Sequence, residues 1–179
     1  QQDLGQQALY DALADARKNN FCYEEKEKAL LAATLQQLAH IQVEGAQNLD
    51  FAQCLPPIRF DQQAAMFDLN YFKYSFLKTT DLPFDEIKLE ADMQQLATDL
   101  VGDSNEEHYF LYRDFQARNV MLCEGEPYFI DFQGGMQGPL QYDVASFLWQ
   151  ASARYPQSLR NELIEVYTEE LQKLLPHFN

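Results

Sequence analysis

The chain is poor in basic residues. It has 13 lysines and arginines against 28 aspartates and glutamates, a formal net charge of -15 over 179 residues. Nucleic acids and anionic membrane surfaces are bound largely through clustered cationic side chains. We therefore expect no nucleic-acid partner and no membrane partner for this chain.

Cysteine and histidine are scarce as well. The three cysteines lie far apart without a C-x-x-C pair, and the three histidines lack the H-E-x-x-H spacing. Both absences argue against a disulfide framework and against a zinc site. Since unpaired cysteines are typical of reducing compartments, a cytoplasmic location is expected.

Long apolar runs are also missing. No stretch approaches the roughly 20 residues that cross a bilayer, and no charged segment followed by an apolar one marks a signal peptide. Because 46% of the residues are hydrophobic, the chain can still form one globular domain with its own core. It opens on Gln1 in a polar stretch rather than on Met, so we expect a further segment upstream.

Helical periodicity covers most of the chain. Helices are predicted over residues 7–18, around 31–41, from an N-cap at 61 to about 78, around 89–100, from 142 to 151 and from about 158 to 174. A loop is predicted between Glu44 and Phe60, where Pro56-Pro57 interrupts any regular pattern. The helix after Asp61 is rich in aromatic residues, and their simplest interpretation is that they belong to the core.

A β-prone region interrupts the helices. Short runs at 109–112, 120–123 and 128–130, with Glu124-Gly125-Glu126 between the last two, predict a hairpin. The predicted fold class is therefore mainly α with a small β-hairpin, in one domain.

The predicted hairpin brings polar residues together. Asn119 and Asp131 lie equally far on either side of Gly125, so pairing of the strands is expected to place both side chains at the same open end. Asp114, five residues before Asn119, is expected to return to that end. Carboxylate and amide oxygens are the ligands that Mg²⁺ prefers, and the three residues predict a magnesium site.

The same residues carry a family resemblance. Tyr112 to Asn119 (YRDFQARN) resembles the catalytic loop H-R-D-x-x-x-x-N of the protein-kinase fold, and Ile130 to Gly134 (IDFQG) stands where its D-F-G is found. Both motifs most resemble those of the aminoglycoside phosphotransferase and choline kinase-like enzymes. Within that group, the R-D-F opening at Arg113, the run DFQ from Asp131, and Gly138-Pro139 followed by Tyr142 to Ser146 (YDVAS) resemble bacterial anomeric sugar kinases of cell-wall recycling, which phosphorylate N-acetylmuramate or N-acetylglucosamine at C1.

The resemblance implies cofactors and residue roles. ATP and Mg²⁺ are the implied cofactors, with Asp114 orienting the proton of the acceptor hydroxyl and with Asn119 and Asp131 holding the metal. Asp143 is expected to accept hydrogen bonds from backbone N–H groups of the catalytic loop, although an ordinary N-cap explains it nearly as well.

Two further residues of the loop are assigned to its support. Arg113 is expected to pair with phosphate or with acidic neighbours. Gln116 stands where the group often carries a His or Lys near the transferred phosphate, and as a neutral residue it can only donate hydrogen bonds.

The resemblance also implies that a lobe is missing. No Gly-rich phosphate loop and no V-A-I-K-like strand precede the motifs. Residues 1–7 resemble the hinge between two lobes, with Gln2, Asp3 and Leu4 at the adenine, and residues 8–179 are expected to form the helical C-terminal lobe. The β-rich N-terminal lobe is then a partner that this chain lacks, and we expect the chain alone to bind ATP poorly and to be inactive.

The acceptor is predicted from the aromatic helix. Asp68, Asn70, Tyr71 and Lys73 are expected to bind a small-molecule sugar or amino sugar, by stacking and by hydrogen bonds to its hydroxyls. Three alternatives stay open: an aminoglycoside kinase, a catalytically silent pseudokinase-like binding module, and a metal-dependent phosphohydrolase that uses the same carboxylates.

Overall fold

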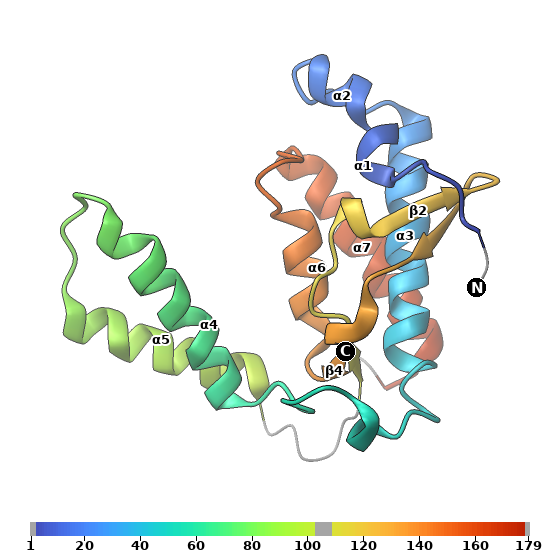
Figure 1. The fold of residues 1–179 in the computed structure, drawn as a ribbon. Helices are drawn as coiled ribbons and strands as arrows, with labels where there is room; N and C mark the ends of the chain where they lie inside the picture. Colours follow the sequence, from blue (N-terminus) through green and yellow to red (C-terminus); the bar gives the residue numbers. More distant parts are fainter. Residues whose placement is uncertain (1–2, 103–108, 178–179) are drawn as a thin grey trace.

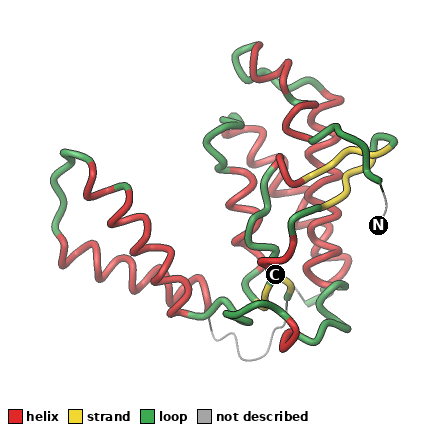
Figure 2. The backbone as a smooth tube through the Cα atoms, in the orientation of Figure 1, coloured by secondary structure: helices red, strands yellow, loops and turns green. Residues whose placement is uncertain are grey.

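The computed structural model describes residues 3–102 and 109–177 (Figure 1). Its helices are α1 (Leu9–Ala12), α2 (Ala14–Lys18), α3 (Glu25–Val43), α4 (Gln62–Ser75), α5 (Glu86–Val101), α6 (Leu140–Leu148) and α7 (Gln157–Leu174). One small sheet pairs β1 (Phe110–Leu111) with β4 (Met136–Gln137), and the other pairs β2 (Val120–Cys123) with β3 (Glu126–Phe129). Helix predominates throughout (Figure 2), so the predicted fold class, mainly α with a small β-hairpin, is confirmed.

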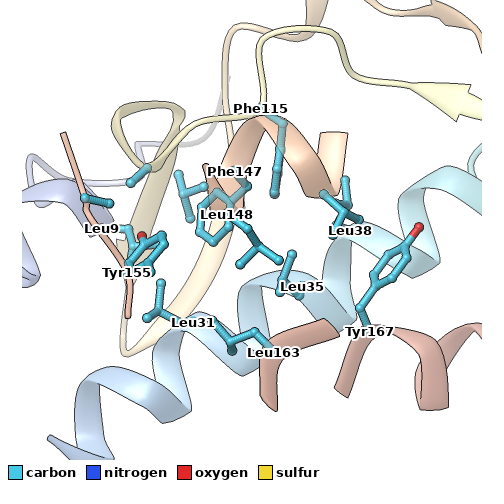
Figure 3. Packing of buried hydrophobic residues seen from close by; sticks show 14 of the residues in the cluster. Leu9, Leu31, Leu35, Leu38, Phe115, Phe147, Leu148, Tyr155, Leu163 and Tyr167 are labelled. Atoms are coloured by element: carbon cyan, nitrogen blue, oxygen red, sulfur yellow. The ribbon is translucent and has the colours of Figure 1, made fainter. Parts of the chain in front are cut away.

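The core lies between α3 and α7, with α6 and α1 packed against them. Leu31, Leu35 and Leu38 recur at helical spacing on α3 and are fully buried. They share one cluster with Leu163 and Tyr167 of α7 (Figure 3). Each fully buried leucine contributes about 2 kcal/mol of hydrophobic free energy.

The N-terminal helical region differs from the prediction. One helix was expected over residues 7–18, but the chain forms α1 and α2 with a break at Leu13, where φ is -89° and ψ is 11°. Leu9, Leu13 and Ala16 are all buried. Despite the break, all three apolar residues still pack into the core.

Helices α4 and α5 form a hairpin that extends away from the other helices (Figure 1). Asp61 caps α4 by accepting a hydrogen bond from the Ala64 N–H, and Gly102 ends α5 with a φ of 57°. The expectation that the aromatics of α4 are core is wrong, since Phe67 and Tyr71 are 70% and 69% exposed. Helix α4 also ends at Ser75 rather than near 78, and a short 3-10 helix follows it.

The β elements match the predicted positions only in part. The β2–β3 turn contains two residues, Glu124 and Gly125, both with positive φ, as in the turn that fits the twist of a hairpin. The first predicted strand pairs not with this hairpin but with β4, a strand that sequence analysis missed. Phe60, at the end of the predicted loop, is buried and donates its N–H to the Gln137 carbonyl.

Two further observations complete the fold. Within the described ranges, no helix combines the length and apolar character that crossing a bilayer requires. The predicted hinge residue Gln2 lies outside the described residues.

Candidate active site

The loop that carries Asp114 joins β1 to β2 and is anchored by aromatic residues. Tyr112 and Phe115 are 1% exposed. The Phe115 ring lies 5.5 Å from that of Tyr112, 5.1 Å from Phe129 of β3 and 5.2 Å from Phe147 of α6. The loop is therefore fixed on both sides of Asp114, while Asp114 itself is exposed.

Two side-chain amides hold Asp114. Gln116 donates from Nε2 to Oδ1 over 2.9 Å, and Asn119 donates from Nδ2 to Oδ2 over 3.1 Å. The same Asn119 nitrogen also donates to the Asp114 backbone carbonyl over 2.9 Å. The carboxylate is thus exposed and yet held by two neutral donors.

Asn119 and Asp131 lie at the open end of the hairpin, but they are not direct partners. The Ile130 N–H donates to the Asn119 carbonyl over 3.0 Å, which places Asp131 one residue beyond. The prediction put the centre of the hairpin at Gly125, whereas the two-residue turn centres it between Glu124 and Gly125.

The backbone at Asp131 is in the left-handed region, with a φ of 71°. That conformation costs a non-glycine residue about 1 kcal/mol or more and requires support from its surroundings. Gln133 supplies some of it, because its Nε2 donates to Asp131 Oδ1 over 2.8 Å.

Tyr112 lies where the site's carboxylates meet. Burial raises the pKa of its hydroxyl, and the negative charges of Asp131, Asp143 and Asp114 raise it further. The hydroxyl donates to the Ile130 carbonyl. The loop and the end of β3 are therefore joined by a phenol that stays protonated.

Asp143 supports the loop from below. It is the fourth residue of α6, whose N-cap is Pro139, so the N-cap alternative is excluded. Its carboxylate accepts the backbone N–H of Tyr112 over 2.8 Å and that of Arg113 over 3.0 Å. Burial raises the pKa of Asp143 to about 6, and the donated hydrogen bonds only partly oppose this shift.

Arg113 connects the loop to α4. It has a φ of 80°, and its Nη2 donates to Asp68 Oδ1 over 2.7 Å. Its guanidinium lies 5.2 Å from the centre of the Phe60 ring and 5.5 Å from that of Tyr142. Nη1 is buried without a hydrogen-bond partner among the described residues, and the rings compensate it in part.

Only one of the four residues predicted to bind the acceptor lies at this loop. Asp68 accepts hydrogen bonds from Arg113 and, over 3.1 Å, from the hydroxyl of Tyr142. Burial raises the pKa of Tyr142 to about 12, so this donor is protonated at neutral pH. The carboxylate is therefore already occupied by contacts within the protein.

The other three residues of α4 lie elsewhere. Asn70 donates to the Met66 carbonyl of its own helix, and Tyr71 is exposed. Lys73 is 4% exposed and faces α5, where its Nζ lies 3.4 Å from Glu90 and 3.6 Å from Glu86.

The segment predicted to be the hinge contacts the β2–β3 hairpin. The Leu122 N–H of β2 donates to the Gln7 carbonyl over 2.8 Å, and Ala8 forms an antiparallel bridge with Met121. Asp3 is exposed and Leu4 is half-buried.

A scan against protein-family models decides the family. Residues 9–177 match the phosphotransferase enzyme family, APH. The chain belongs to the phosphotransferase enzyme family. The match covers the catalytic loop, the hairpin and every helix described above.

Two curated proteins are similar to this family member over most of its length. One, from Neisseria meningitidis serogroup B, is an N-acetylmuramate/N-acetylglucosamine kinase and is 27% identical over 150 residues, which cover 82% of this chain and 42% of the relative. Its counterpart in Pseudomonas aeruginosa has the same name and is 28% identical over 156 residues, covering 87% of this chain and 41% of the relative. The chain thus spans about two-fifths of the length of these relatives.

A solved structure was also found. The gentamicin–APH(2″)-IIa complex matches with a TM-score of 0.49 and 17% identity, covering 95% of this chain and 56% of that one.

Two buried residues of this phosphotransferase chain were missed by sequence analysis. Gln42 of α3 donates to Asp143 over 3.1 Å, and the Tyr167 hydroxyl of α7 donates to Gln42. They are 101 and 125 residues distant from the groups that they contact, so no local pattern signals them.

Proposed function

We propose that the chain is the catalytic helical lobe of an ATP- and Mg²⁺-dependent kinase that phosphorylates a hydroxyl of a small sugar or amino sugar. The observation that carries the proposal is the geometry of Asp114, an exposed carboxylate held by two amide donors on a loop anchored by Asp143. Phosphoryl transfer depends on positioning and charge more than on covalent chemistry, and such a carboxylate is suited to it. The names of the two curated relatives support a sugar acceptor.

Asp114 has one task in this proposal. Its carboxylate accepts a hydrogen bond from the acceptor hydroxyl and would take its proton as the acceptor oxygen bonds to the γ-phosphorus of ATP and the bond from that phosphorus to the β–γ bridging oxygen breaks, with ADP as the leaving group. Asn119 and Gln116 donate to the two carboxylate oxygens, which fixes the direction in which the remaining lone pairs point.

The oxygen donors beside Asp114 are suited to Mg²⁺. The hydrogen bonds of the Asn119 side chain within the described residues are donated by Nδ2, which leaves Oδ1 for a ligand. The Asp131 carboxylate is exposed. Across residues 3–102 and 109–177 no three His, Cys, Asp or Glu side chains form a metal-binding group, so Asn119 is essential to this assignment. The ion would neutralise charge on the nucleotide phosphates.

We further propose that residues 1–7 are the hinge and residues 8–179 the C-terminal lobe, with Gln2, Asp3 and Leu4 beside the adenine. The contact of Gln7 and Ala8 with β2 supports this, because it brings the segment to the metal-binding hairpin. A chain of net charge -15 repels a nucleotide triphosphate, and cationic groups of an N-terminal lobe would offset that repulsion.

On the acceptor side, we retain Tyr71 as the residue that stacks on the sugar. Asp68 reaches the acceptor only by way of Arg113, since both of its oxygens accept hydrogen bonds within the protein. Asn70 and Lys73 are proposed to contribute less to acceptor binding than Tyr71, because their polar groups already contact α4 and α5.

The test is Asp114→Asn, with Asp92→Asn on the exposed surface of α5 as the matched control. Transfer from Mg-ATP to N-acetylglucosamine and to N-acetylmuramate is measured in the protein that contains this chain together with its N-terminal lobe. We expect Asp114→Asn to lose about 10²- to 10⁴-fold in kcat at an unchanged unfolding midpoint, and Asp92→Asn to lose nothing.

Other outcomes would contradict the proposal. Phosphate release that does not require an acceptor would indicate the phosphohydrolase. Nucleotide binding without transfer to any sugar, unaffected by Asp114→Asn, would indicate the binding module. Transfer to an aminoglycoside but to neither sugar would indicate an aminoglycoside kinase.

A further inference from the structure

Three buried polar side chains, Asp143, Gln42 and Tyr167, form a hydrogen-bonded series that ends at the loop carrying Asp114. Asp143 and Gln42 are 0% exposed and Tyr167 is 5% exposed. Polar side chains are rarely buried so completely unless their hydrogen bonds are satisfied. Tyr167 contacts Gln42, Gln42 contacts Asp143, and Asp143 accepts the backbone N–H groups of Tyr112 and Arg113.

The direction of each hydrogen bond follows from its partner. The Tyr167 hydroxyl donates to Gln42 Oε1, which leaves Gln42 Nε2 pointing the other way. From there Nε2 donates to Asp143 Oδ2 and to the Leu140 carbonyl, each over 3.1 Å. Asp143 Oδ2 and the Leu140 carbonyl are both acceptors, so Gln42 must turn its amide nitrogen toward them, and the Tyr167 hydroxyl holds the opposite end of the amide at Oε1.

Asp143 connects Gln42 to the backbone of the loop. Oδ2 accepts from both Gln42 and the Tyr112 N–H, whereas Oδ1 accepts from the Arg113 N–H. The two amides directly precede Asp114, and Arg113 lies in the left-handed backbone region that needs such support. A rotation of the carboxylate would move the backbone that carries Asp114.

We propose that Gln42 and Tyr167 are positioning residues for phosphoryl transfer, which act through Asp143 on the backbone that orients Asp114. The inference rests on the proposed function for its kinetic consequence, but not for its structural one. It joins α3 and α7 to the loop that carries Asp114, which lies 72 residues after Gln42 and 53 residues before Tyr167.

The alternative is that these groups only stabilise the core. A polar network is costly to disrupt because each group left without a partner keeps its desolvation penalty. Loss of stability alone therefore cannot distinguish the two roles. A matched substitution elsewhere in the core can.

The test compares Tyr167→Phe with Tyr23→Phe. Tyr23 is 7% exposed, and its hydroxyl donates to the Ala153 carbonyl over 2.7 Å. Each substitution removes one buried hydroxyl and its short donated hydrogen bond, and Tyr167→Phe also removes a 3.5 Å contact with the Leu140 carbonyl, so both variants are expected to lose similar stability. Only Tyr167→Phe is expected to lower kcat, by about tenfold to a hundredfold, with the acceptor KM unchanged.

A second measurement does not depend on activity. Amide hydrogen exchange at Tyr112 and Arg113 is expected to become at least about tenfold faster in Tyr167→Phe but not in Tyr23→Phe, at matched global stability. Gln42→Met, which keeps the side-chain length and removes the donor to Asp143, is expected to repeat both effects and serves if Tyr167→Phe does not fold.

Equal kcat and equal exchange in the Tyr167→Phe and Tyr23→Phe variants would overturn the inference. Failure of the proposed function is separate. If Asp114→Asn kept full turnover, the kinase assignment would be wrong, while the exchange rates would still test the positioning of the loop.

Discussion

Two regions of the molecule have the same periodic pattern of apolar residues: the core helices α3 and α7, and the α4–α5 hairpin. They differ in how much of the apolar face is buried. On α3, Leu35 is fully buried, whereas Leu96 on α5 is 52% exposed. Both leucines lie in helices with apolar neighbours at three- and four-residue spacing. Periodicity therefore reports a helix, but burial requires a second surface that the hairpin does not meet.

The hairpin is attached to the rest of the molecule by a small set of contacts. Its apolar cluster with the site region consists of Phe60, Ala65, Ala97, Leu111 and Met136. The Arg113–Asp68 ion pair adds a polar contact between α4 and the loop that carries Asp114. Within the hairpin itself, Lys73 occupies a buried position against α5.

The largest effect expected from this comparison is the loss of a core leucine. Leu35→Ala should lower the free energy of unfolding by about 3 kcal/mol or more, because it opens a cavity in the α3–α7 seam. The chemically identical Leu96→Ala should cost less than about 0.5 kcal/mol. Denaturant unfolding of both variants measures the difference, and equal losses would refute the contrast between the two regions.

The next prediction concerns the buried carboxylate on the core side. Burial raises the pKa of Asp143 to about 6, above the ordinary value of 3.8 that applies on unfolding, so the folded state holds the proton more tightly. The protonated Asp143 side chain therefore contributes roughly 3 kcal/mol to the free energy of unfolding below about pH 4. This contribution is lost as the pH rises through about 6.

NMR titration measures this directly. The Tyr112 and Arg113 amide shifts should change with a midpoint near pH 6. A midpoint near the ordinary value of 3.8 would contradict a raised Asp143 pKa.

A smaller effect is expected at the contact between the two regions. Asp68→Ala removes the ionic partner of Arg113 and the acceptor of the Tyr142 hydroxyl, and should cost about 1 to 3 kcal/mol. Exposed Asp92→Ala on α5 is the control. Unfolding free energies of the two variants, with amide exchange in α4, would show whether the pair fastens the hairpin; identical values would mean that it does not.

The smallest effect lies on the surface between α3 and α7. Hydrogen bonding to Glu44 raises the pKa of His40, burial opposes this, and Glu170 raises it further. The ion pairs thus stabilise the fold fully below about pH 6.5, and that stability is lost as pH rises through the higher folded pKa.

The measurement is the stability difference between the wild-type protein and His40→Gln at low and high pH. Since the imidazole is 38% exposed, solvent screening limits this difference to about 0.5 kcal/mol. His177→Gln near the C-terminus is the control, and a difference independent of pH would dismiss the ionic contribution of His40.

Sequence analysis succeeded where a signal is local. The helices of the core, the Asp61 cap and the β2–β3 hairpin follow from spacing and turn chemistry, and the structure contains them. The break at Leu13, the β1–β4 pair and the exposure of Phe67 were not foreseen. Each depends on which surface is available for packing, a property of the whole chain.

The amino-acid sequence by itself determined the order of chemical groups: an Asp, an Asn five residues later and an Asp after a short hairpin, together with the family to which they point. Only the tertiary structure decided that Asp68 is occupied by Arg113 and that Gln42 and Tyr167 lie beneath Asp143. The reason is physical. Spacing along a chain fixes contacts within a turn or a hairpin, but contacts between distant segments are decided by how the helices pack.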